Sequence, residues 1–474
     1  MYDCLVIGGG VIGGGILRKL SQYKLKIALL EKENDVAMGA SKANSGIVHA
    51  GFDAPEGSNK ARFNVEGNKM MRSYCEELGV KFSPCGSLVV AFSDEDMKAL
   101  ETLLQRGKKN GVEQLEIIDA VRLKAMEPNI SDKAVGALWA PTGGIVCPYE
   151  LTVASIGNAM DNGAELFTDF EVVRIEKRGE VFTVVSADGR SVKGKAIINC
   201  AGLGSGKIAS LAGDDTVHVF PRKGEYELLD RESAGFVNHT LFFAPTKLGK
   251  GVLISPTVDN NIIVGPTAQE CGGTDTTAQG LEFIKVKSKE MCPGVPLYNT
   301  ITSFAGVRAY SDRHDFIIEK SVATKGLVNV AGIESPGLTS APAIAKYVVD
   351  ELVATLLPLA KNEKFNPIRK PDYFFSRLSA QEKNEIIKKD SSYGKIVCRC
   401  EQITEGEIVR AVRENPPAKS VDAVKRRTRA GMGRCQGGFC QPHVAEIIAR
   451  ELNIPLEKVT KSGNGSYLLV EKIK

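Results

Sequence analysis

The sequence predicts a mixed fold of the α/β and α+β classes. A discontinuous Rossmann-like domain is expected to carry an antiparallel β-sheet domain, and a small helical domain to follow at the C-terminus. Residues 1–33 read as strand, glycine-rich turn, helix and strand. Residues 167–268 contain short apolar runs separated by turn residues, which is typical of antiparallel strands. Four cysteines gather between residues 398 and 440, which indicates a separate small domain.

The composition is typical of a soluble protein with an almost balanced charge. The chain has 474 residues, 43% of them hydrophobic, and a net charge of +4. This length predicts two or three domains, and so small a charge gives no reason to expect nucleic acid as a partner. No transmembrane segment is expected, because no run of about 18 uninterrupted apolar residues occurs.

The cysteines and the start of the chain favour a cytoplasmic protein. Residues 3–7 read as a strand so early that no cleavable leader is expected. Eleven cysteines, an odd number, in a chain of this size are typical of a reducing compartment. Seven of them stand alone and are interpreted as small buried apolar residues: Cys4, Cys75, Cys85, Cys147, Cys200, Cys271 and Cys292.

Regular elements are expected along most of the chain. Apolar periodicity predicts helices over residues 60–80 and 94–110, with a strand over 86–92 between them. Residues 327–331 read as a strand of parallel type, followed by a helix from about residue 340. The remaining strands are predicted at residues 170–176, 182–186, 196–200, 224–229, 240–244, 251–255 and 261–264.

The turn after the first strand carries a dinucleotide-binding fingerprint. Residues 8–13 have the G-x-G-x-x-G spacing between a strand and a helix, and Glu31 closes the second strand. The glycines allow a pyrophosphate to approach the helix N-terminus, and the acid would accept from ribose hydroxyls. The alternative is a glycine-rich turn that only packs helix on sheet. The contacts expected are Gly8, Gly10, Val11, Ile12, Gly13 and Glu31.

Two further segments suit a flavin. Residues 39–51 are small, polar and glycine-rich, as a backbone lying against a planar cofactor needs. Residues 331–340 join a strand to a helix and could place N–H groups near the flavin pyrimidine, where reduction brings negative charge. Gly202, which follows the strand predicted at residues 196–200, is expected to contact the cofactor too. The other expected contacts are Ser41, Ser45, Gly46, Val48, Gly332, Gly337, Leu338 and Thr339.

These segments resemble the D-amino-acid-oxidase-type superfamily of FAD-dependent oxidoreductases, which holds FAD with residues in both places. Residues 44–51, 223–226 and 337–340 resemble L-2-hydroxyglutarate dehydrogenases within it. Residues 305–308 are shared with FAD-dependent glycerol-3-phosphate dehydrogenases. The resemblance covers roughly residues 1–355 and implies FAD as the cofactor.

The cysteines near the C-terminus form a C-x-C pair and a C-x4-C pair. Four thiolates brought together in this way suit an iron–sulfur cluster. A capping box at residues 404–407 and a proline at 442 predict two helices that begin just after the pairs, with their N-termini facing an anionic cluster. The metal ligands expected are Cys398, Cys400, Cys435 and Cys440.

Residues 397–440 resemble the bacterioferritin-associated-ferredoxin-like (BFD-like) [2Fe–2S] module. They are most similar to the version fused to the large subunit of anaerobic glycerol-3-phosphate dehydrogenases, through the run at residues 426–437. A zinc site is the alternative, but zinc sites prefer C-x2–4-C spacing, and the C-x-C pair is too tight for the usual knuckle.

The predicted cluster domain is basic. Residues 391–450 carry 11 Lys and Arg against 6 Asp and Glu, with residues 425–429 contributing a dense group. We interpret this excess as a solvated helix face that also compensates the charge of the cluster. The alternative is a docking patch for an acidic electron acceptor.

His49 and Arg308 are the expected catalytic residues. Oxidation of a secondary alcohol needs a base for the hydroxyl proton, and His49 lies in the flavin-contacting segment. The alternative is that His49 is a structural histidine that bonds to the flavin or to the backbone. His314 is the second candidate for the base. The resemblance to glycerol-3-phosphate dehydrogenases implies that Arg308 binds the substrate anion, for which a guanidinium is well suited.

Other pocket residues are less well defined by the sequence. The resemblance implies that Lys223 and Tyr226 line the substrate pocket. No second phosphate-binding arginine is evident near His49. The basic residues nearest to it in the sequence are Lys42, Lys60 and Arg62.

The sequence therefore predicts an FAD-dependent dehydrogenase of a small anionic hydroxy compound. Hydride is expected to pass to FAD, and electrons then through a [2Fe–2S] cluster to an acceptor protein or a quinone-linked subunit. Such a subunit leaves a peripheral membrane contact open. sn-Glycerol 3-phosphate, oxidised to dihydroxyacetone phosphate, is the first expected substrate. L-2-hydroxyglutarate or an imino acid is the alternative, and a non-catalytic electron-transfer subunit is the alternative of another class.

The expected domains follow from these assignments. The oxidoreductase spans residues 1–357, and its substrate domain is inserted in the FAD-binding domain. Within it, the FAD-binding parts are residues 1–80, 145–215 and 300–357, and the substrate-domain parts are residues 81–144 and 216–299. The remaining parts are a linker at residues 358–390, the cluster domain at 391–450 and a tail at 451–474.

Overall fold

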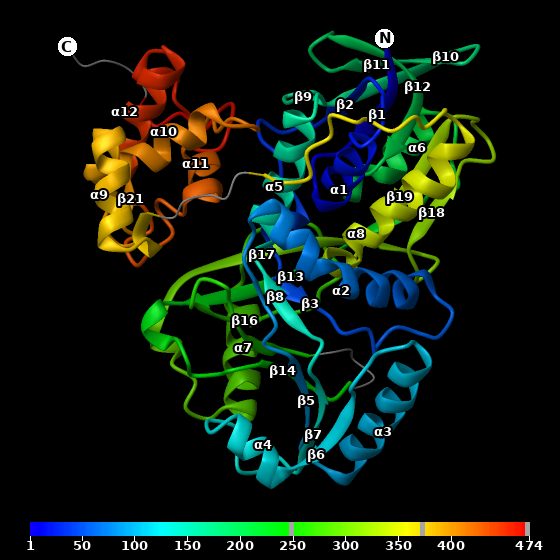
Figure 1. The fold of residues 1–474 in the computed structure, drawn as a ribbon. Coiled ribbons are helices and arrows are strands. Elements are labelled where there is room, and N and C mark those ends of the chain that lie inside the picture. Colours follow the sequence, from blue (N-terminus) through cyan, green and yellow to red (C-terminus); the bar gives the residue numbers. More distant parts are fainter. Residues whose placement is uncertain (246–250, 370–374, 470–474) are drawn as a thin grey trace.

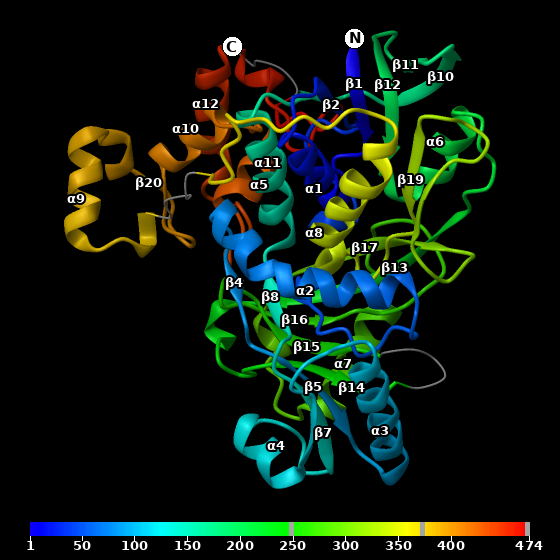
Figure 2. The same ribbon diagram turned by 45° about the vertical axis from the view of Figure 1, so that its right-hand side comes forward.

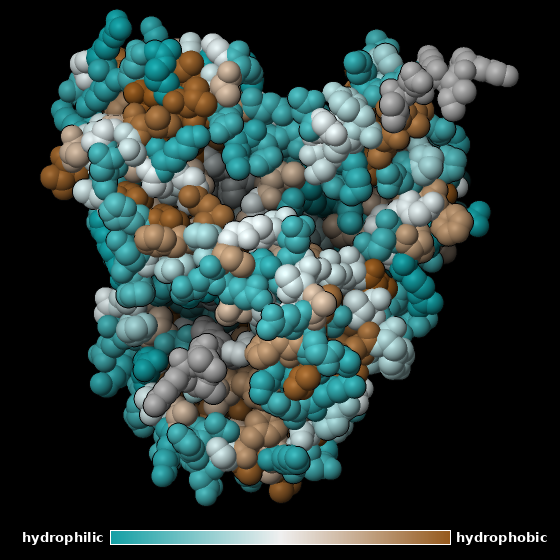
Figure 3. All heavy atoms as spheres, turned by 180° about the vertical axis from the view of Figure 1, so that it is seen from behind, coloured by the Kyte–Doolittle hydropathy of each residue, from teal (hydrophilic) through white to brown (hydrophobic). Residues whose placement is uncertain are grey.

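The computed structural model describes residues 1–245, 251–369 and 375–469. Figure 1 shows a central sheet with its helices above a second sheet, and a small helical domain to one side. Seen from behind, the small domain and the lobe of the central sheet are parted by a notch in the surface (Figure 3). This arrangement confirms the predicted fold class. Parts of the predicted linker and tail, at residues 370–374 and 470–474, lie outside the described residues.

The central sheet has eight strands and a parallel core. β1 pairs in parallel with β2 and β12, β2 with β9, and β12 with β19. The hairpin of β10 and β11 and the edge strand β18 are antiparallel. The strands are β1 (Tyr2–Ile7), β2 (Ile27–Leu30), β9 (Glu165–Phe167), β10 (Val172–Arg178), β11 (Val181–Ser186), β12 (Ser191–Asn199), β18 (Ile317–Lys320) and β19 (Leu327–Ala331).

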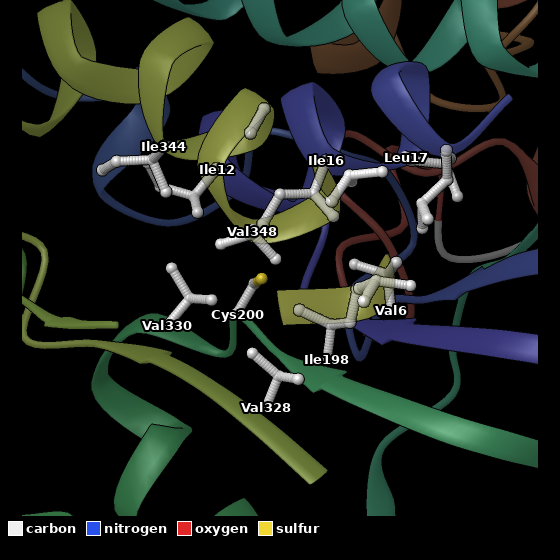
Figure 4. Packing of buried hydrophobic residues seen from close by; sticks show 14 of the residues in the cluster. Val6, Ile12, Ile16, Leu17, Ile198, Cys200, Val328, Val330, Ile344 and Val348 are labelled. Atoms are coloured by element: carbon white, nitrogen blue, oxygen red, sulfur yellow. The ribbon is translucent and has the colours of Figure 1, made fainter. Parts of the chain in front are cut away.

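Three helices cover one face of this sheet and form its main core with it. In Figure 4, Ile12 and Ile16 of the first helix point toward Val6 and Ile198 on the strands. Side chains of this size each contribute about 1.5–3 kcal/mol when fully buried, so the core holds the glycine-rich turn firmly at the sheet edge. The helices are α1 (Val11–Leu20), α5 (Pro148–Asp161) and α8 (Gly337–Tyr347).

Helix α8 begins three residues before the predicted start at residue 340. Its first turn is fixed by tertiary contacts, because Thr339 Oγ1 accepts a hydrogen bond from the N–H of His49. Helix α2 packs so closely on it that a Cβ at Gly67 would lie 2.1 Å from the carbonyl oxygen of Thr339. Periodicity alone does not report such contacts. The remaining helices of this lobe are α2 (Asn59–Leu78) and, on the opposite face of the sheet, α6 (Ser205–Leu211).

The second sheet also has eight strands, and all its pairs are antiparallel except that of β14 with β5. The predicted strands are found, although β13 begins at Val219 and not at residue 224, and β6, β7 and β17 were not predicted. Its strands are β5 (Ser87–Ala91), β6 (Glu116–Asp119), β7 (Gly136–Ala140), β13 (Val219–Leu229), β14 (Thr240–Phe243), β15 (Leu253–Pro256), β16 (Ile262–Gly265) and β17 (Thr300–Ser311). The helices beside it are α3 (Asp94–Lys109), α4 (Ala120–Met126) and α7 (Ala278–Met291).

A three-stranded ribbon lies where the two sheets meet. It pairs β8 (Gly144–Val146) with β3 (Ile47–Val48) and β4 (Phe82–Ser83). Strand β3 brings the predicted flavin segment to the boundary between the sheets.

The small domain packs its own core beside the central sheet. Its helices α10 (Glu405–Arg413), α11 (Val421–Thr428) and α12 (Gln441–Leu452) surround Ile408, Val424 and Ile448. The hairpin of β20 (Ile396–Cys398) and β21 (Ile403–Thr404) precedes them. In Figures 1 and 2, α11 lies beside α5, whereas α9 (Ala380–Lys389) lies at the outer edge.

The predicted linker is therefore partly helical. Helix α9 opens with a capping box between Ser379 and Glu382. Before it, the N–H of Phe375 donates to Glu407, and the Phe375 side chain is buried. Within the described residues, no helix has both the length and the apolar character needed to cross a membrane.

The cysteines that stand alone divide into two groups. Cys4, Cys75, Cys147, Cys200 and Cys292 are buried. The prediction that all seven are buried is wrong for Cys85, which is half-buried, and for Cys271, which is exposed in the segment between β16 and α7.

Candidate active site and cluster site

A cavity of about 2750 Å³ runs between the central sheet and the second sheet. It begins at the glycine-rich turn after β1 and passes the segment at residues 38–55. It then reaches the β13–β17 face and the start of α8. Twelve of the predicted residues line it: Gly8, Gly10, Val11, Ile12, Glu31, Ser41, Ser45, His49, Gly202, Arg308, Gly337 and Leu338.

Five predicted residues lie behind the cavity wall instead. A Cβ at Gly13 would lie 2.0 Å from the carbonyl oxygen of Gly8, so this glycine allows helix and turn to pack. Similarly, a Cβ at Gly46 would lie 2.5 Å from the carbonyl oxygen of Val146. Val48 is buried in the core under α2, and Gly332 packs against Ser311. Thr339 accepts a hydrogen bond from the N–H of His49.

The glycine-rich turn has the geometry that a pyrophosphate requires. Gly8 has a φ of +113°, and a Cβ there would lie 2.3 Å from the carbonyl oxygen of Cys200. Gly10 is the N-cap of α1, and the next N–H, that of Val11, donates to Ser41 Oγ at 2.9 Å. Backbone N–H groups at a helix N-terminus favour an anion, so these residues fit the phosphates of a dinucleotide.

Glu31 fixes the same turn from the end of β2. Its Oε2 accepts from the N–H of Gly9 at 2.6 Å, and its Oε1 accepts from the N–H of Glu33 at 2.9 Å. Burial raises the pKa of this carboxyl, although both N–H groups act against that shift. Each carboxylate oxygen has a second lone pair, so Glu31 can also accept from a ribose hydroxyl.

His49, in the first segment predicted to contact the flavin, is held by the second such segment, by β14 and by α2. Its imidazole Nε2 lies 3.3 Å from Ser335 Oγ, and its ring stacks on Phe242 with centroids 5.8 Å apart. Its N–H donates to Thr339, and its carbonyl oxygen accepts from Asn64. The ring therefore has a defined place in the cavity wall.

Arg308, on β17, is among the residues that line the cavity. Its Nε and Nη2 are shielded from solvent and have no hydrogen-bond acceptor among the described residues. Opposed residues of an antiparallel pair share a face, and Arg222 on β13 is the direct partner of Arg308. Gly306 lies two residues before Arg308 on β17 and so on the same face. It packs closely on the predicted flavin segment, since a Cβ there would lie 1.9 Å from the carbonyl oxygen of Ala43. Two cations thus face the segment expected to hold the flavin.

Arg222 was not among the residues predicted from the sequence. A strand is predicted at residues 224–229, next to Arg222, but none is predicted at residues 304–308, so the pairing of these two segments was not foreseen. The antiparallel register then places Arg222 opposite Arg308. Its guanidinium lies 3.5 Å from Glu334, which also pairs with Lys60 at 2.8 Å. The second basic position of the pocket therefore comes from β13.

Lys223 does not belong to this pocket. It lies one residue along β13 from Arg222 and so faces the other side of the sheet. There its Nζ pairs with Glu225 at 2.8 Å, and both side chains are buried. Tyr226 does line the cavity, stacked on Phe304 at 5.0 Å, and so does His314.

The four predicted cysteine ligands meet as two pairs of thiols. Cys400 Sγ and Cys435 Sγ lie 3.6 Å apart. A hydrogen bond with Cys440 lowers the pKa of Cys398 to about 6. Burial acts to raise the pKa of Cys435, but backbone N–H groups, including that of Phe439, hold it below the usual value. A backbone N–H of Cys435 acts to lower the pKa of Cys400, but burial and the Cys435 thiol keep it above the usual value, and the hydrogen bond with Cys398 raises the pKa of Cys440. Each pair therefore favours one thiolate, the form of cysteine that binds iron.

The arrangement places two pairs of thiols in one small domain. Across residues 1–245, 251–369 and 375–469, no three or more His, Cys, Asp or Glu side chains converge to hold a single metal ion. Two separate thiol pairs match a [2Fe–2S] cluster, in which each iron takes two protein ligands. The helices α10 and α12 begin just after Cys400 and at Cys440, as predicted.

The basic residues of α11 are neither solvated nor available to a partner. The side chains of Arg426 and Arg427 are 6% exposed, and both pair with Asp35 beyond β2. Arg429 is also buried and pairs with Asp259, in the β15–β16 turn, at 2.7 Å. The solvated face and the docking patch are therefore both wrong for these three residues, whereas compensation of the cluster charge stays a prediction. They attach the small domain to both sheets, through partners that are distant in sequence.

Comparisons with known proteins support both cofactors. A family model described as FAD dependent oxidoreductase matches residues 3–351. A second, described as BFD-like [2Fe-2S] binding domain, matches residues 396–450. Glycerol 3-phosphate dehydrogenase of Caloramator mitchellensis is 48% identical over 477 residues, which cover 100% of this chain and 99% of that protein.

Two further relatives share the larger part only. L-2-hydroxyglutarate dehydrogenase of Escherichia coli (strain K12) is 32% identical over 273 residues, 56% of this chain and 64% of that protein. The solved structure of dithionite-reduced L-alpha-glycerophosphate oxidase from Mycoplasma pneumoniae, with FAD bound, superposes with a TM-score of 0.74 and 31% identity. The match covers 78% of this chain and 98% of that one.

Proposed function

Because this chain belongs to the family of FAD-dependent oxidoreductases and ends in a BFD-like [2Fe–2S] domain, we propose that it is a dehydrogenase of sn-glycerol 3-phosphate. The product would be dihydroxyacetone phosphate. The full-length similarity to a glycerol 3-phosphate dehydrogenase supports the substrate. In the structure, the observation that carries the proposal is Arg308, whose shielded donors have no acceptor among the described residues.

The chemistry is divided between the bound groups and the side chains. When bound, FAD accepts the hydride from the carbon that bears the hydroxyl, and the [2Fe–2S] cluster passes the electrons one at a time to an acceptor. The side chains bind the anion, orient the hydroxyl and remove its proton.

Arg308 and Arg222 bind the phosphate of the substrate. A guanidinium donates two parallel hydrogen bonds to a phosphate, and Nε with Nη2 of Arg308 is such a pair of donors. Arg222 lies on the same face and adds a second positive charge. Because Arg222 is already close to Glu334, it contributes less than Arg308.

His49 takes the hydroxyl proton on Nε2. A base must lie within hydrogen-bond reach of the proton that it removes. Ser335 Oγ, 3.3 Å from Nε2, can accept a hydrogen bond from Nε2 once this nitrogen carries the proton. The stacking on Phe242 and the bond from the N–H to Thr339 hold the imidazole in place while the proton moves.

Anaerobic addition of glycerol 3-phosphate to the purified holoenzyme tests the proposal. We expect rapid bleaching of the visible flavin absorbance. If the flavin stays oxidised but dithionite still reduces it, glycerol 3-phosphate is rejected as the substrate. Bleaching by L-2-hydroxyglutarate would then favour a 2-hydroxy acid, whose carboxylate Arg308 could bind equally well. No bleaching with any hydroxy or imino acid would favour a non-catalytic electron-transfer subunit.

The cluster is the proposed outlet for the electrons, toward an acceptor protein or a quinone-linked subunit in the cytoplasm. Cys435→Ser should lose the iron signal in electron paramagnetic resonance while substrate still bleaches the flavin. Dye reduction at the flavin should continue in this variant, but reduction of an acceptor that docks at the cluster should stop. Loss of the flavin as well would contradict separate sites.

A further inference from the structure

Residues 31–38, here called the Asp35 segment, join the dinucleotide turn to the small domain. At one end of the segment, Glu31 accepts from the N–H of Gly9 in the glycine-rich turn. Near the other end, the N–H of Ala37 donates to the carbonyl oxygen of the same Gly9 at 2.9 Å. The segment therefore holds Gly9, in the middle of the phosphate-binding turn, from both of its sides.

The middle of the same segment is held by the small domain. Asp35 Oδ2 accepts from Arg426 Nη2 at 2.6 Å, and Asp35 Oδ1 accepts from Arg427 Nη2 at 2.8 Å. The Asp35 side chain is only 4% exposed. Beside it, Asn34 Nδ2 donates to Ser420 Oγ at 3.4 Å, at the start of α11. Val36, the next residue, is fully buried in the core of the central sheet.

The two guanidinium groups dominate the electrostatics of Asp35. Burial by itself would raise the pKa of its carboxyl, but Arg427 and Arg426 lower it to about 2. The carboxylate is therefore charged throughout the physiological range, and its removal would leave two buried cations without their partner. A segment tied this strongly at its centre cannot move independently of the small domain.

We propose that Asp35 is a positioning residue that couples docking of the small domain to retention of FAD. Asp35 does not line the cavity, whereas Glu31, four residues before it, and Gly9 both do. When Arg426 and Arg427 hold Asp35, the Asp35 segment holds Glu31 and Gly9 in the geometry that the ribose and pyrophosphate need. Docking of the domain and binding of FAD thus stabilise each other, as thermodynamic linkage requires.

The second junction of the small domain supplies a matched control. Asp259 is also buried, 7% exposed, and pairs with Arg429 at 2.7 Å. It lies in the turn between β15 and β16 and does not line the cavity. Loss of Asp259 should loosen the small domain as much as loss of Asp35. It has no connection through a short segment to the dinucleotide turn.

The test compares D35N with D259N in the full-length holoenzyme. FAD affinity is measured from the return of free flavin fluorescence on dilution, without substrate, so the result does not depend on the proposed function. Limited proteolysis of the exposed chain near residues 360–368 reports on docking of the small domain. We expect faster proteolysis in both variants, and about tenfold weaker FAD binding in D35N, within the usual range of coupling between sites.

FAD affinity equal to that of the wild type in D35N would overturn the proposal. So would an equal loss in D259N, because the coupling would then not pass through the Asp35 segment. If D35N does not fold, R427K serves instead, since lysine keeps the charge but loses the forked pair of donors. R427K should show a smaller but measurable loss of FAD affinity, and no loss in that variant would also overturn the proposal.

Discussion

Arg308, in the cavity, and Arg429, where the small domain meets the second sheet, both have guanidinium nitrogens shielded from solvent, but their partners differ. Arg429 donates to Glu401, to Asp259 and to Asn261, at 2.8, 2.7 and 3.2 Å. Arg308 leaves Nε and Nη2 without an acceptor among the described residues. Buried donors are almost always paired in folded proteins, because an unpaired one loses its hydration without compensation.

This difference indicates that Arg429 has a structural role and that Arg308 binds a ligand. The acceptors of Arg429 belong to the protein, so its contribution is to stability and to the position of the small domain. The acceptor of Arg308 has to come from outside, so its contribution is to binding. Substitutions beside the small domain should therefore change stability, whereas substitutions in the cavity should change substrate binding and turnover.

Arg429→Gln should have the largest effect, on stability. It leaves Glu401 and Asp259 buried with fewer partners, and breaking a buried ion pair from one side costs about 3–5 kcal/mol. Urea denaturation should show this loss, while the rate of flavin bleaching by substrate stays close to that of the wild type. Arg231→Gln is the control, since Arg231 also pairs with Glu401 but is 40% exposed and should contribute about 1 kcal/mol or less.

His49→Ala should have the largest effect on the chemistry. Loss of a general base lowers turnover by at least about 10²-fold, and the free energy of unfolding should change little. Stopped-flow measurement of flavin bleaching gives the rate, and the flavin spectrum of the purified variant shows whether FAD is retained. His218→Ala, an exposed position away from the cavity, is the control. Unchanged turnover in His49→Ala would remove His49 as the base.

Arg308→Gln should mainly weaken substrate binding. Hydrogen bonds to a charged group contribute about 1.5–3 kcal/mol, so kcat/KM should fall by roughly 10- to 100-fold. The melting temperature should stay the same or rise, because Nε and Nη2 of Arg308 have no acceptor among the described residues. Arg313→Gln is the control, as Arg313 is an exposed residue after the same strand, paired with Glu319. A clear loss of stability in Arg308→Gln would contradict the comparison with Arg429.

Arg222→Gln should have the smallest effect. Arg222 is partly exposed and shares Glu334 with Lys60, so its charge is already partly used by the protein. We expect KM for glycerol 3-phosphate to rise by about 3- to 10-fold, with little change in kcat. Steady-state kinetics measure this split. A loss as large as that of Arg308→Gln would show that the two arginines bind the anion as equals.

Much of the dinucleotide turn and of the cluster site could be predicted from local spacing. The G-x-G-x-x-G turn, the acid at Glu31 and the capping box at Thr404 each depend on residues a few positions apart, or on one βαβ unit. The C-x-C and C-x4-C spacings likewise mark the four cysteines. The thiols that meet come from different motifs, Cys400 with Cys435 and Cys398 with Cys440, so the fold of the small domain brings them together. The family models match both of these regions.

The basic run of α11 and the pocket face of β13 could not be resolved in this way. Periodicity placed Arg426 and Arg427 on a helix but did not show that their partner is Asp35. It predicted a strand near Lys223 but not which face of that strand meets the cavity, and the pocket cation is Arg222 instead. In a strand, an error of one residue reverses the face.

Residues that are neighbours along the chain were enough to predict the fold class, the two cofactor motifs and the positions of the four cysteines. Which arginines are paired, and which one is left for a ligand, depends instead on the packing of the domains. Asp35 and Arg426 are 391 positions apart. Contacts at such distances depend on how whole domains pack, and a buried charge shows its role only when its partners are known.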